Sequence, residues 1–205
     1  MFMTLKIAVL GSTKGTDMQA IIDSIERNDL DARISVVISN KEDAYILERA
    51  RKHGIEAIYI DHNGKTREDF DREMAEEIDK MDVDLILLIG FMRILSEWFC
   101  GHYENRIVNI HPSLIPAFEG GMDINVHEEV IKRGCRVSGC TLHFVTENVD
   151  RGPIIMQKPV MVDNDETPET LKDKVQKAEQ ECFIEAIRKF SEGKIVLDNG
   201  RVKIL

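Results

Sequence analysis

The sequence predicts an α/β fold, built as an open, twisted, mostly parallel sheet with helices on both faces. Short apolar segments alternate with amphipathic segments through the first half of the chain, a rhythm typical of right-handed strand–helix–strand units. The continuous apolar run at residues 85–89 indicates a central parallel strand that is covered on both faces. With 205 residues, the chain can bury a substantial core and fits a single domain.

Strand and helix signals can be placed one by one in the first half. Thr16, with Gln19 three positions on, reads as a capping box that starts the first helix. A second helix is expected to begin at Asn40 and to end at Lys52, before Gly54. Thr66 opens a third helix, whose buried stripe is Phe70, Met74 and Ile78. The expected strands lie at residues 5–10, 34–39, 57–60, 85–89 and 107–110.

The second half of the chain departs from this rhythm. A long loop at residues 112–123 precedes a helix at about residues 125–134, and two longer strands follow near 137–146 and 153–162. Thr167 caps the last helix, with Pro168 in its first turn. Asn199 and Gly200, between two short apolar segments, indicate a terminal hairpin. The core positions of the last helix are Leu171, Val175, Ala178 and Cys182.

Charge and cysteine content exclude several classes of function. A net charge of −10 at pH 7 argues against a nucleic-acid or membrane surface, because both partners attract basic stripes. It leaves room for one small anionic ligand held by local donors. The four cysteines form no C-x-x-C pair, which favours reduced thiols and a cytoplasmic location over a Cys135–Cys140 disulfide. No apolar run approaches the ~20 residues that a membrane-spanning helix needs.

Asn109, His111 and Asp150 are the strongest candidates for catalysis. Side chains at positions i and i+2 share one face of a strand, so Asn109 and His111 can both reach one substrate atom. An amide, an imidazole and a carboxylate suffice to polarise a carbonyl, stabilise an oxyanion and move a proton. Pro112 biases His111 away from a helix. The alternative on local grounds is a buried histidine bonded to the backbone.

The loop at residues 11–16 follows the first strand and precedes the first helix. In an open α/β sheet this position offers free backbone N–H groups and a helix dipole to an anion. The loop matches neither G-x-G-x-x-G nor a Walker sequence, and the second strand ends in Ser39–Asn40 instead of an acid. A single phosphate monoester is therefore favoured over a nucleotide cofactor, with a plain turn as the alternative.

The remaining histidines give weaker signals. His53, His62 and His102 lie in polar surroundings and are expected at the surface. His127 is ambiguous, and His143 is interpreted as a structural histidine more readily than as a catalyst. Because no set of three or four ligands has the spacing of a zinc site, no metal is expected.

Four stretches together resemble the folate-dependent formyltransferase family. They are N-I-H-P-S-L-I-P at 109–116 with F-E-G at 118–120, G-F-M-R-I-L at 90–95, C-T-L-H-F-V at 140–145, and Asp150 with G-P-I-I at 152–155. The likeness runs over nearly the whole chain and is greatest to the branch that formylates glycinamide ribonucleotide. Methionyl-tRNA formyltransferases and formyl-folate hydrolases resemble it too but carry an extra domain, which 205 residues do not hold.

The resemblance implies the formyltransferase fold and a reaction. A Rossmann-like, phosphate-binding half would span residues 1–110, and a folate-binding and catalytic half residues 111–205. The implied reaction transfers the formyl group of 10-formyltetrahydrofolate to the amine of a phosphorylated ribosyl glycinamide, without a metal. Carried over onto this chain, Asn109 and His111 hold the formyl oxygen, and Asp150 bonds to His111 and relays the proton. The implied folate site is Met92, Arg93, Ile94, Leu95, Val145 and Asp150, and the implied substrate site is Ser12, Thr13, Lys14, Gly15, Thr16, Arg67 and Glu179.

The chain departs from the family pattern at the implied acceptor site. The family's phosphate loop reads S-G-x-G-S-N, whereas Thr13 and Asp17 stand here in place of its first glycine and its asparagine. The loop at 119–126 is a few residues longer. The alternatives are therefore another phosphorylated amine as acceptor, or hydrolysis of 10-formyltetrahydrofolate. A non-catalytic folate or nucleotide-binding module is disfavoured, because a binder does not need Asn109, His111 and Asp150 together. Small molecules are the expected partners of a monomer or weak homodimer.

Overall fold

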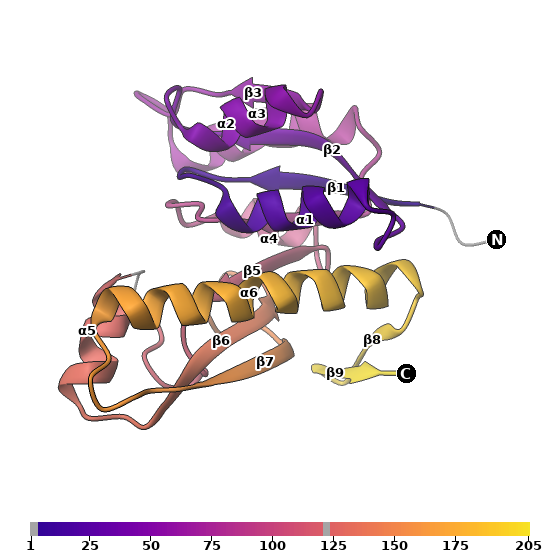
Figure 1. Cartoon of the computed structure of the whole chain (residues 1–205). Coiled ribbons are helices and arrows are strands. Elements are labelled where there is room, and N and C mark those ends of the chain that lie inside the picture. The colour runs from indigo at the N-terminus through magenta and orange to yellow at the C-terminus, as the bar shows by residue number, and fades with distance from the viewer. Residues whose placement is uncertain (1–3, 121–123) are drawn as a thin grey trace.

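Seven strands form one sheet in the order β3-β2-β1-β4-β5-β6-β7 (Figure 1). A computed structural model describes residues 4–120 and 124–205. The pairings among β1 to β5 are parallel, and β6 and β7 join the β5 edge in antiparallel fashion. The predicted mostly parallel α/β sheet is confirmed. The strands are β1 (Leu5–Leu10), β2 (Ala32–Ser39), β3 (Glu56–Tyr59), β4 (Leu85–Leu88), β5 (Ile107–His111), β6 (Val137–Phe144) and β7 (Ile154–Met161).

Helices cover both faces of this sheet because the side chains of β1 alternate between two cores. Ile7 and Val9 pack into one apolar cluster with the buried faces of α1 (Thr16–Glu26), α2 (Tyr45–Lys52) and α6 (Pro168–Ser191). Ala8 and Leu10 pack into the opposite cluster with α3 (Arg67–Asp79) and α4 (Glu97–His102). The stripe predicted for α3 is buried, since Phe70, Met74 and Ile78 have no exposed surface.

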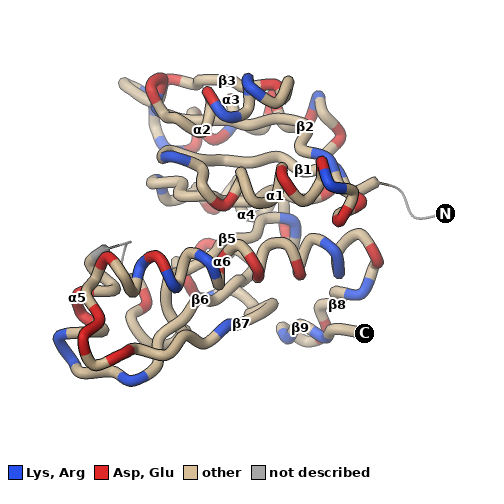
Figure 2. Tube along the Cα trace, in the orientation of Figure 1, with Lys and Arg blue, Asp and Glu red and all other residues tan. Residues whose placement is uncertain are grey.

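A third apolar cluster packs against the antiparallel edge of the sheet. It joins α5 (Ile124–Lys132) and the N-terminal half of α6 to β6 and β7. All four positions predicted for the last helix, Leu171, Val175, Ala178 and Cys182, belong to this cluster. α6 packs alongside α1 and over β6 and β7 (Figure 1), and acidic and basic residues are interspersed along it (Figure 2). The terminal hairpin, β8 (Ile195–Asp198) and β9 (Arg201–Ile204), forms as predicted.

Two predicted helix caps are wrong, and one helix is missing from the prediction. The first helix has Gly15 as its N-cap, in the left-handed region at φ 66°, and no side-chain cap from Thr16. Asn40 does not start the second helix, which follows Ala44, because the Asn40 amide accepts a hydrogen bond from Ser12 instead. The unpredicted α4 is short and begins with the Ser96 hydroxyl accepting from the Phe99 N–H. The caps at Thr66 and Thr167 are confirmed.

The cysteines come from separate segments of the chain, and two of them form one close pair. All four cysteines are free thiols, and Cys140 lies 3.7 Å from Cys182, Sγ to Sγ, and not against Cys135. Among the described residues, no helix combines the length and the apolar character that a membrane span requires.

The turn between β6 and β7 depends on Gly152. A Cβ at this position would lie 1.8 Å from the Phe144 carbonyl oxygen, which belongs to the backbone and cannot rotate away. The Phe144 N–H donates to the Pro153 carbonyl at 2.9 Å, so the two ends of the turn are held at this close approach.

We therefore expect Gly152→Ala to lower the free energy of unfolding by about 1 to 3 kcal/mol, the cost of forcing an extra methyl into a packed site. Urea denaturation measures this loss. Gly101→Ala is the matched control, because nothing lies within 4 Å of a Cβ on this helical glycine. The control should be neutral or more stable by a few tenths of a kcal/mol. Equal stability of the two variants would contradict the account of the turn.

Candidate active site

The register between β5 and β6 assembles one polar face. Asn109 lies opposite His143, and His111 lies opposite Thr141. Since alternate residues of a strand share a face, Asn109, His111 and His143 project to the same side of the sheet. Asn109 Nδ2 lies 3.3 Å from His143 Nε2. Sequence reasoning placed Asn109 and His111 together correctly, and the structure adds His143 to them.

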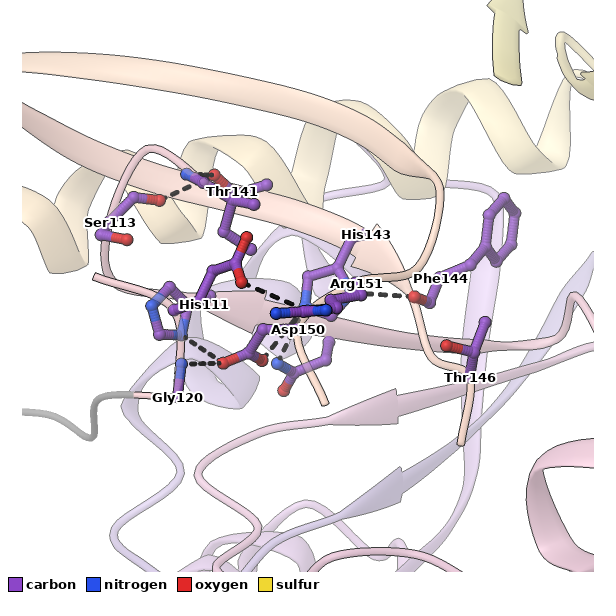
Figure 3. Close-up of polar contacts among 12 residues, drawn as sticks. His111, Ser113, Gly120, Thr141, His143, Phe144, Thr146, Asp150 and Arg151 are labelled. Atoms are coloured by element: carbon purple, nitrogen blue, oxygen red, sulfur yellow. Dashed lines mark hydrogen bonds and ion pairs between the residues drawn. The ribbon is translucent and has the colours of Figure 1, made fainter. Parts of the chain in front are cut away.

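Asp150 reaches this face from the turn after β6. Its backbone lies in the left-handed region at φ 56°. One carboxylate oxygen, Oδ2, lies 3.3 Å from His111 Nδ1, and the other, Oδ1, lies 3.6 Å from His143 Nε2 (Figure 3). The Gly120 N–H donates to Oδ2 at 3.0 Å. Two imidazoles and one backbone amide therefore surround a single carboxylate that is 10% exposed.

Burial and charge act in opposite directions on these groups. Burial alone would raise the pKa of Asp150, but the hydrogen bond with His143, the charge of His111 and the Gly120 N–H outweigh it and lower the pKa below 3.8. Burial lowers the pKa of His111 below 6.5, although Asp150 and the Phe118 carbonyl both favour its charged form. At neutral pH the site therefore holds an ionised Asp150 beside a mainly neutral His111.

Backbone carbonyls bind one nitrogen of each histidine. His143 Nδ1 lies 2.8 Å from the Phe144 carbonyl oxygen, and His111 Nε2 lies 2.9 Å from the Phe118 carbonyl oxygen. A carbonyl only accepts, so these two nitrogens carry hydrogens. The Nε2 atom of His143 lies between the Asn109 amide and the Asp150 carboxylate. Asn109 keeps a second amide hydrogen for a substrate carbonyl.

The segment after β4 borders the polar face. Of the residues predicted to bind folate, Met92 and Ile94 are exposed and Leu95 is buried. The Arg93 guanidinium lies 4.7 Å from the centre of the Phe70 ring. Val145 continues β6 and donates its N–H to the Ile107 carbonyl, which places it beside the strand that carries Asn109 and His111. Two exposed apolar side chains next to a polar face suit a flat, partly apolar ring system.

The loop at residues 11–16 touches the same segment. Ser12 is buried, donates its hydroxyl to Asn40 at 2.6 Å and accepts from the Met92 N–H at 2.9 Å. A Cβ on Gly90 would lie 2.3 Å from the Thr13 hydroxyl oxygen, so the loops after β1 and β4 are in contact. Thr13 and Lys14 are exposed at the start of α1. The sequence-predicted phosphate loop and folate segment are therefore neighbours.

A buried carboxyl lies at the start of α1. Asp17 is 7% exposed, and its Oδ1 atom has no hydrogen-bond partner among the described residues. Burial raises its pKa to about 6, although a hydrogen bond with Gln180 works in the opposite direction. Gln180 is the neighbour of Glu179 on α6, so Asp17 ties the start of α1 to the part of α6 where Glu179 was predicted to meet the substrate.

Arg67 begins α3, one turn before the buried Asp71 on the same helix. Burial raises the pKa of Asp71, against the hydrogen bonds from Ser96 and the charges of Arg93 and Arg67. Arg67 and Arg93, the latter from the segment after β4, therefore act on the same carboxyl. Within the described residues, no cluster of three or more His, Cys, Asp or Glu side chains could hold a metal ion.

Comparison with known proteins decides the family. A family model described as formyl transferase matches residues 5–187, well over half of the chain. The chain belongs to the formyl transferase family. The resemblance drawn from residues 109–116 and the three other stretches is thereby confirmed.

Relatives of this formyl transferase fall into two size classes. A phosphoribosylglycinamide formyltransferase of Escherichia coli is 38% identical over 192 residues, which are 93% of this chain and 89% of that protein. The trifunctional purine biosynthetic protein adenosine-3 of Bos taurus is 42% identical over 199 residues. These are 96% of this chain, but the chain spans only 19% of the length of that relative.

Solved structures agree with the fold. A glycinamide ribonucleotide transformylase of Symbiobacterium toebii superposes with a TM-score of 0.93 at 42% identity, covering 98% of this chain and 94% of that one. A formyltetrahydrofolate deformylase of Burkholderia mallei has a TM-score of 0.89 at 24% identity, over 98% of this formyl transferase and 70% of that chain. The second likeness shows the fold alone.

His143 is the residue of this formyl transferase's site that sequence reasoning undervalued. Alone on a strand, it gave no signal that separated a catalytic from a structural histidine. The deciding information is the pairing of β5 with β6, which sets His143 opposite Asn109. The position of His143 in the site follows from the long-range strand register, which no local sequence pattern encodes.

The raised pKa of Asp17 predicts a pH-dependent stability. A carboxyl whose pKa rises from 3.8 to about 6 on folding is most favourable to the fold when protonated. Its contribution is complete below pH 3.8 and is lost as pH rises through about 6. We expect Asp17→Asn to be more stable than the wild type by about 1 to 3 kcal/mol at pH 7.5, with the difference shrinking toward pH 4.

Urea denaturation across this pH range measures the effect. Asp43→Asn is the control for the loss of one carboxylate, because Asp43 is exposed. A stability difference between Asp17→Asn and the wild type that stays constant from pH 4 to pH 7.5 would contradict the assignment.

Proposed function

We propose that this formyl transferase transfers the formyl group of 10-formyltetrahydrofolate to the amine of glycinamide ribonucleotide. The observation that carries the proposal is the convergence of Asn109, His111 and Asp150 on one face of the sheet. The neighbouring strand β4 leads into the segment that contacts the loop at the start of α1. The names of the relatives, at 38% and 42% identity over nearly the whole chain, support the same reaction. The trifunctional relatives act in purine biosynthesis by name, which supports the same role here.

Each polar residue of the site has a separate role in the proposed reaction. The formyl oxygen, where negative charge develops as the amine attacks, accepts from the second amide hydrogen of Asn109 and from an N–H of His111 in its charged form. His111 Nδ1 lies beside the Asp150 carboxylate, which stabilises that charge. The pair accepts the proton that the amine loses, directly or through water, and passes it to the folate nitrogen as the bond from that nitrogen to the formyl carbon breaks. His143 holds the amide of Asn109 in place.

The folate fits the segment that the sequence assigned to it. When bound, it supplies the formyl group. Met92 and Ile94 offer exposed apolar surface to a pterin ring, and Arg93, Leu95, Val145 and Asp150 complete the proposed site. The acceptor's phosphate is assigned to Ser12, Thr13, Lys14, Gly15 and Thr16, and the remainder of the acceptor to Arg67 and Glu179. Asp17 would oppose a phosphate when ionised.

Further parts of the proposal follow from the family. The N-terminal half, residues 1–110, carries the phosphate loop, and the C-terminal half, residues 111–205, carries the folate and catalytic groups. We propose small molecules as partners, a monomer or weak homodimer, and a cytoplasmic location.

An assay with 10-formyltetrahydrofolate and glycinamide ribonucleotide tests the reaction, with release of tetrahydrofolate as the readout. Turnover that depends on the amine supports the proposal. Formate released at a rate that the amine does not raise would favour hydrolysis and overturn it. No turnover at high enzyme concentration would overturn it as well.

Asp150→Asn should lower kcat by about 100-fold or more, because the amide cannot accept the proton or stabilise a charged His111. Steady-state kinetics with both substrates measures the effect. Asp165→Asn removes an exposed carboxylate elsewhere and serves as the matched control. Near-wild-type turnover by Asp150→Asn would contradict the catalytic role proposed for this residue.

A further inference from the structure

The backbone at Phe118–Gly120 contacts both members of the His111–Asp150 pair. The Phe118 carbonyl accepts from His111 Nε2 at 2.9 Å, and the Gly120 N–H donates to Asp150 Oδ2 at 3.0 Å. The same carboxylate oxygen lies 3.3 Å from His111 Nδ1 (Figure 3). One short segment therefore fixes the far nitrogen of the imidazole and the near oxygen of the carboxylate.

The contact to His111 decides which nitrogen faces Asp150. The imidazole is 3% exposed, so water competes little for its nitrogens. The Phe118 carbonyl on Nε2 and the ionised Asp150 carboxylate on Nδ1 both only accept, so the charged ring, with a hydrogen on each nitrogen, satisfies both partners. The Phe118 carbonyl thereby holds Nδ1 toward Asp150, where the ring gains its second hydrogen.

The segment adopts an unusual backbone to make this contact. Phe118 lies in the left-handed region at φ 59°, which is uncommon for a bulky residue. Neighbouring hydrogen bonds hold the chain there. Thr141 on β6 donates its hydroxyl to the Ser113 carbonyl at 2.7 Å and accepts from the Ile115 N–H at 3.0 Å. The Ser113 hydroxyl in turn donates to the Ala117 carbonyl.

An ion pair joins the same two pieces of chain. Arg151 Nε lies 3.4 Å from Glu119 Oε2, and these residues adjoin Asp150 and Phe118 respectively. With the arginine side chain 71% exposed, the pair adds little to overall stability. The pair links the segment at 118–120 to the turn that carries Asp150.

We propose that Phe118 and the Glu119–Arg151 pair are positioning residues, which hold the 118–120 backbone so that the Phe118 carbonyl keeps Nδ1 of His111 directed at Asp150. The inference rests on the proposed formyl transfer for its kinetic test. Phe118, Glu119 and Arg151 do not touch the reacting atoms. They orient His111, which does.

Two substitutions of similar size at Phe118 distinguish the effect of its backbone conformation from the effect of losing its ring. Phe118→Asn and Phe118→Val both remove the ring, but asparagine tolerates the left-handed region and valine does not. We expect kcat of Phe118→Val to be at least tenfold below that of Phe118→Asn, with KM values within threefold of each other. Because the Phe118 carbonyl raises the pKa of His111, the histidine limb of the pH profile should lie at lower pH in Phe118→Val.

The ion pair is tested by Arg151→Gln, Glu119→Gln and the double variant. Each single variant should lower kcat by about two- to fivefold at low salt, and the double variant should lose no more than either one. High salt should lower kcat of the wild type toward that of the variants. If the kcat losses of the two single variants multiply in the double variant, the two residues act independently, and the proposed role of the ion pair is wrong.

Equal kcat and equal pH profiles for Phe118→Asn and Phe118→Val would overturn the positioning role, whatever their common activity. If the wild type transfers no formyl group, the proposed function fails and the inference is tested in the free protein. A ¹⁵N titration of His111 should then give a higher midpoint in the wild type and Phe118→Asn than in Phe118→Val, because only the first two keep the Phe118 carbonyl on Nε2. Equal midpoints in the three proteins would overturn it.

Discussion

The buried carboxylate of Asp150 is the group on which the site depends. A carboxylate that is 10% exposed loses much of its hydration, which is costly unless the protein supplies hydrogen bonds and positive charge. His111, His143 and the Gly120 N–H supply them, and together they reverse the effect of burial on its pKa. Remove these neighbours and the carboxyl would be protonated more readily, and the adjacent imidazole would lose its partner.

This constraint explains why distant parts of the chain must meet with fixed geometry. The antiparallel register of β5 and β6 sets Asn109 opposite His143, and the close approach at Gly152 brings the Asp150 turn back over them. At the neighbouring strand ends, Ser12 ties the loop after β1 to the segment after β4. The parallel half of the sheet therefore brings the loop assigned to the acceptor next to the segment assigned to the donor.

The parallel half of the fold could be read from the sequence because its signals are local. The apolar run at 85–89 and the stripe of α3 each follow from one short stretch, and both are present. Asn109 and His111 share a strand, so their common face was predictable too. What escaped prediction depends on partners far along the chain: the cap at Gly15, the recruitment of Asn40 by Ser12, and the placement of His143 by strand register.

The most direct test of this account is a ¹³C titration of the carboxyl carbons of Asp150 and Asp17 in the intact protein. The account predicts that Asp150 shows no protonation step between about pH 7 and pH 4.5, whereas Asp17 titrates with a midpoint of about 6. Both carboxyls are buried, so a difference between their pKa values must come from their neighbours. A midpoint for Asp150 within that range would show that its neighbours do not offset burial, and would contradict the account.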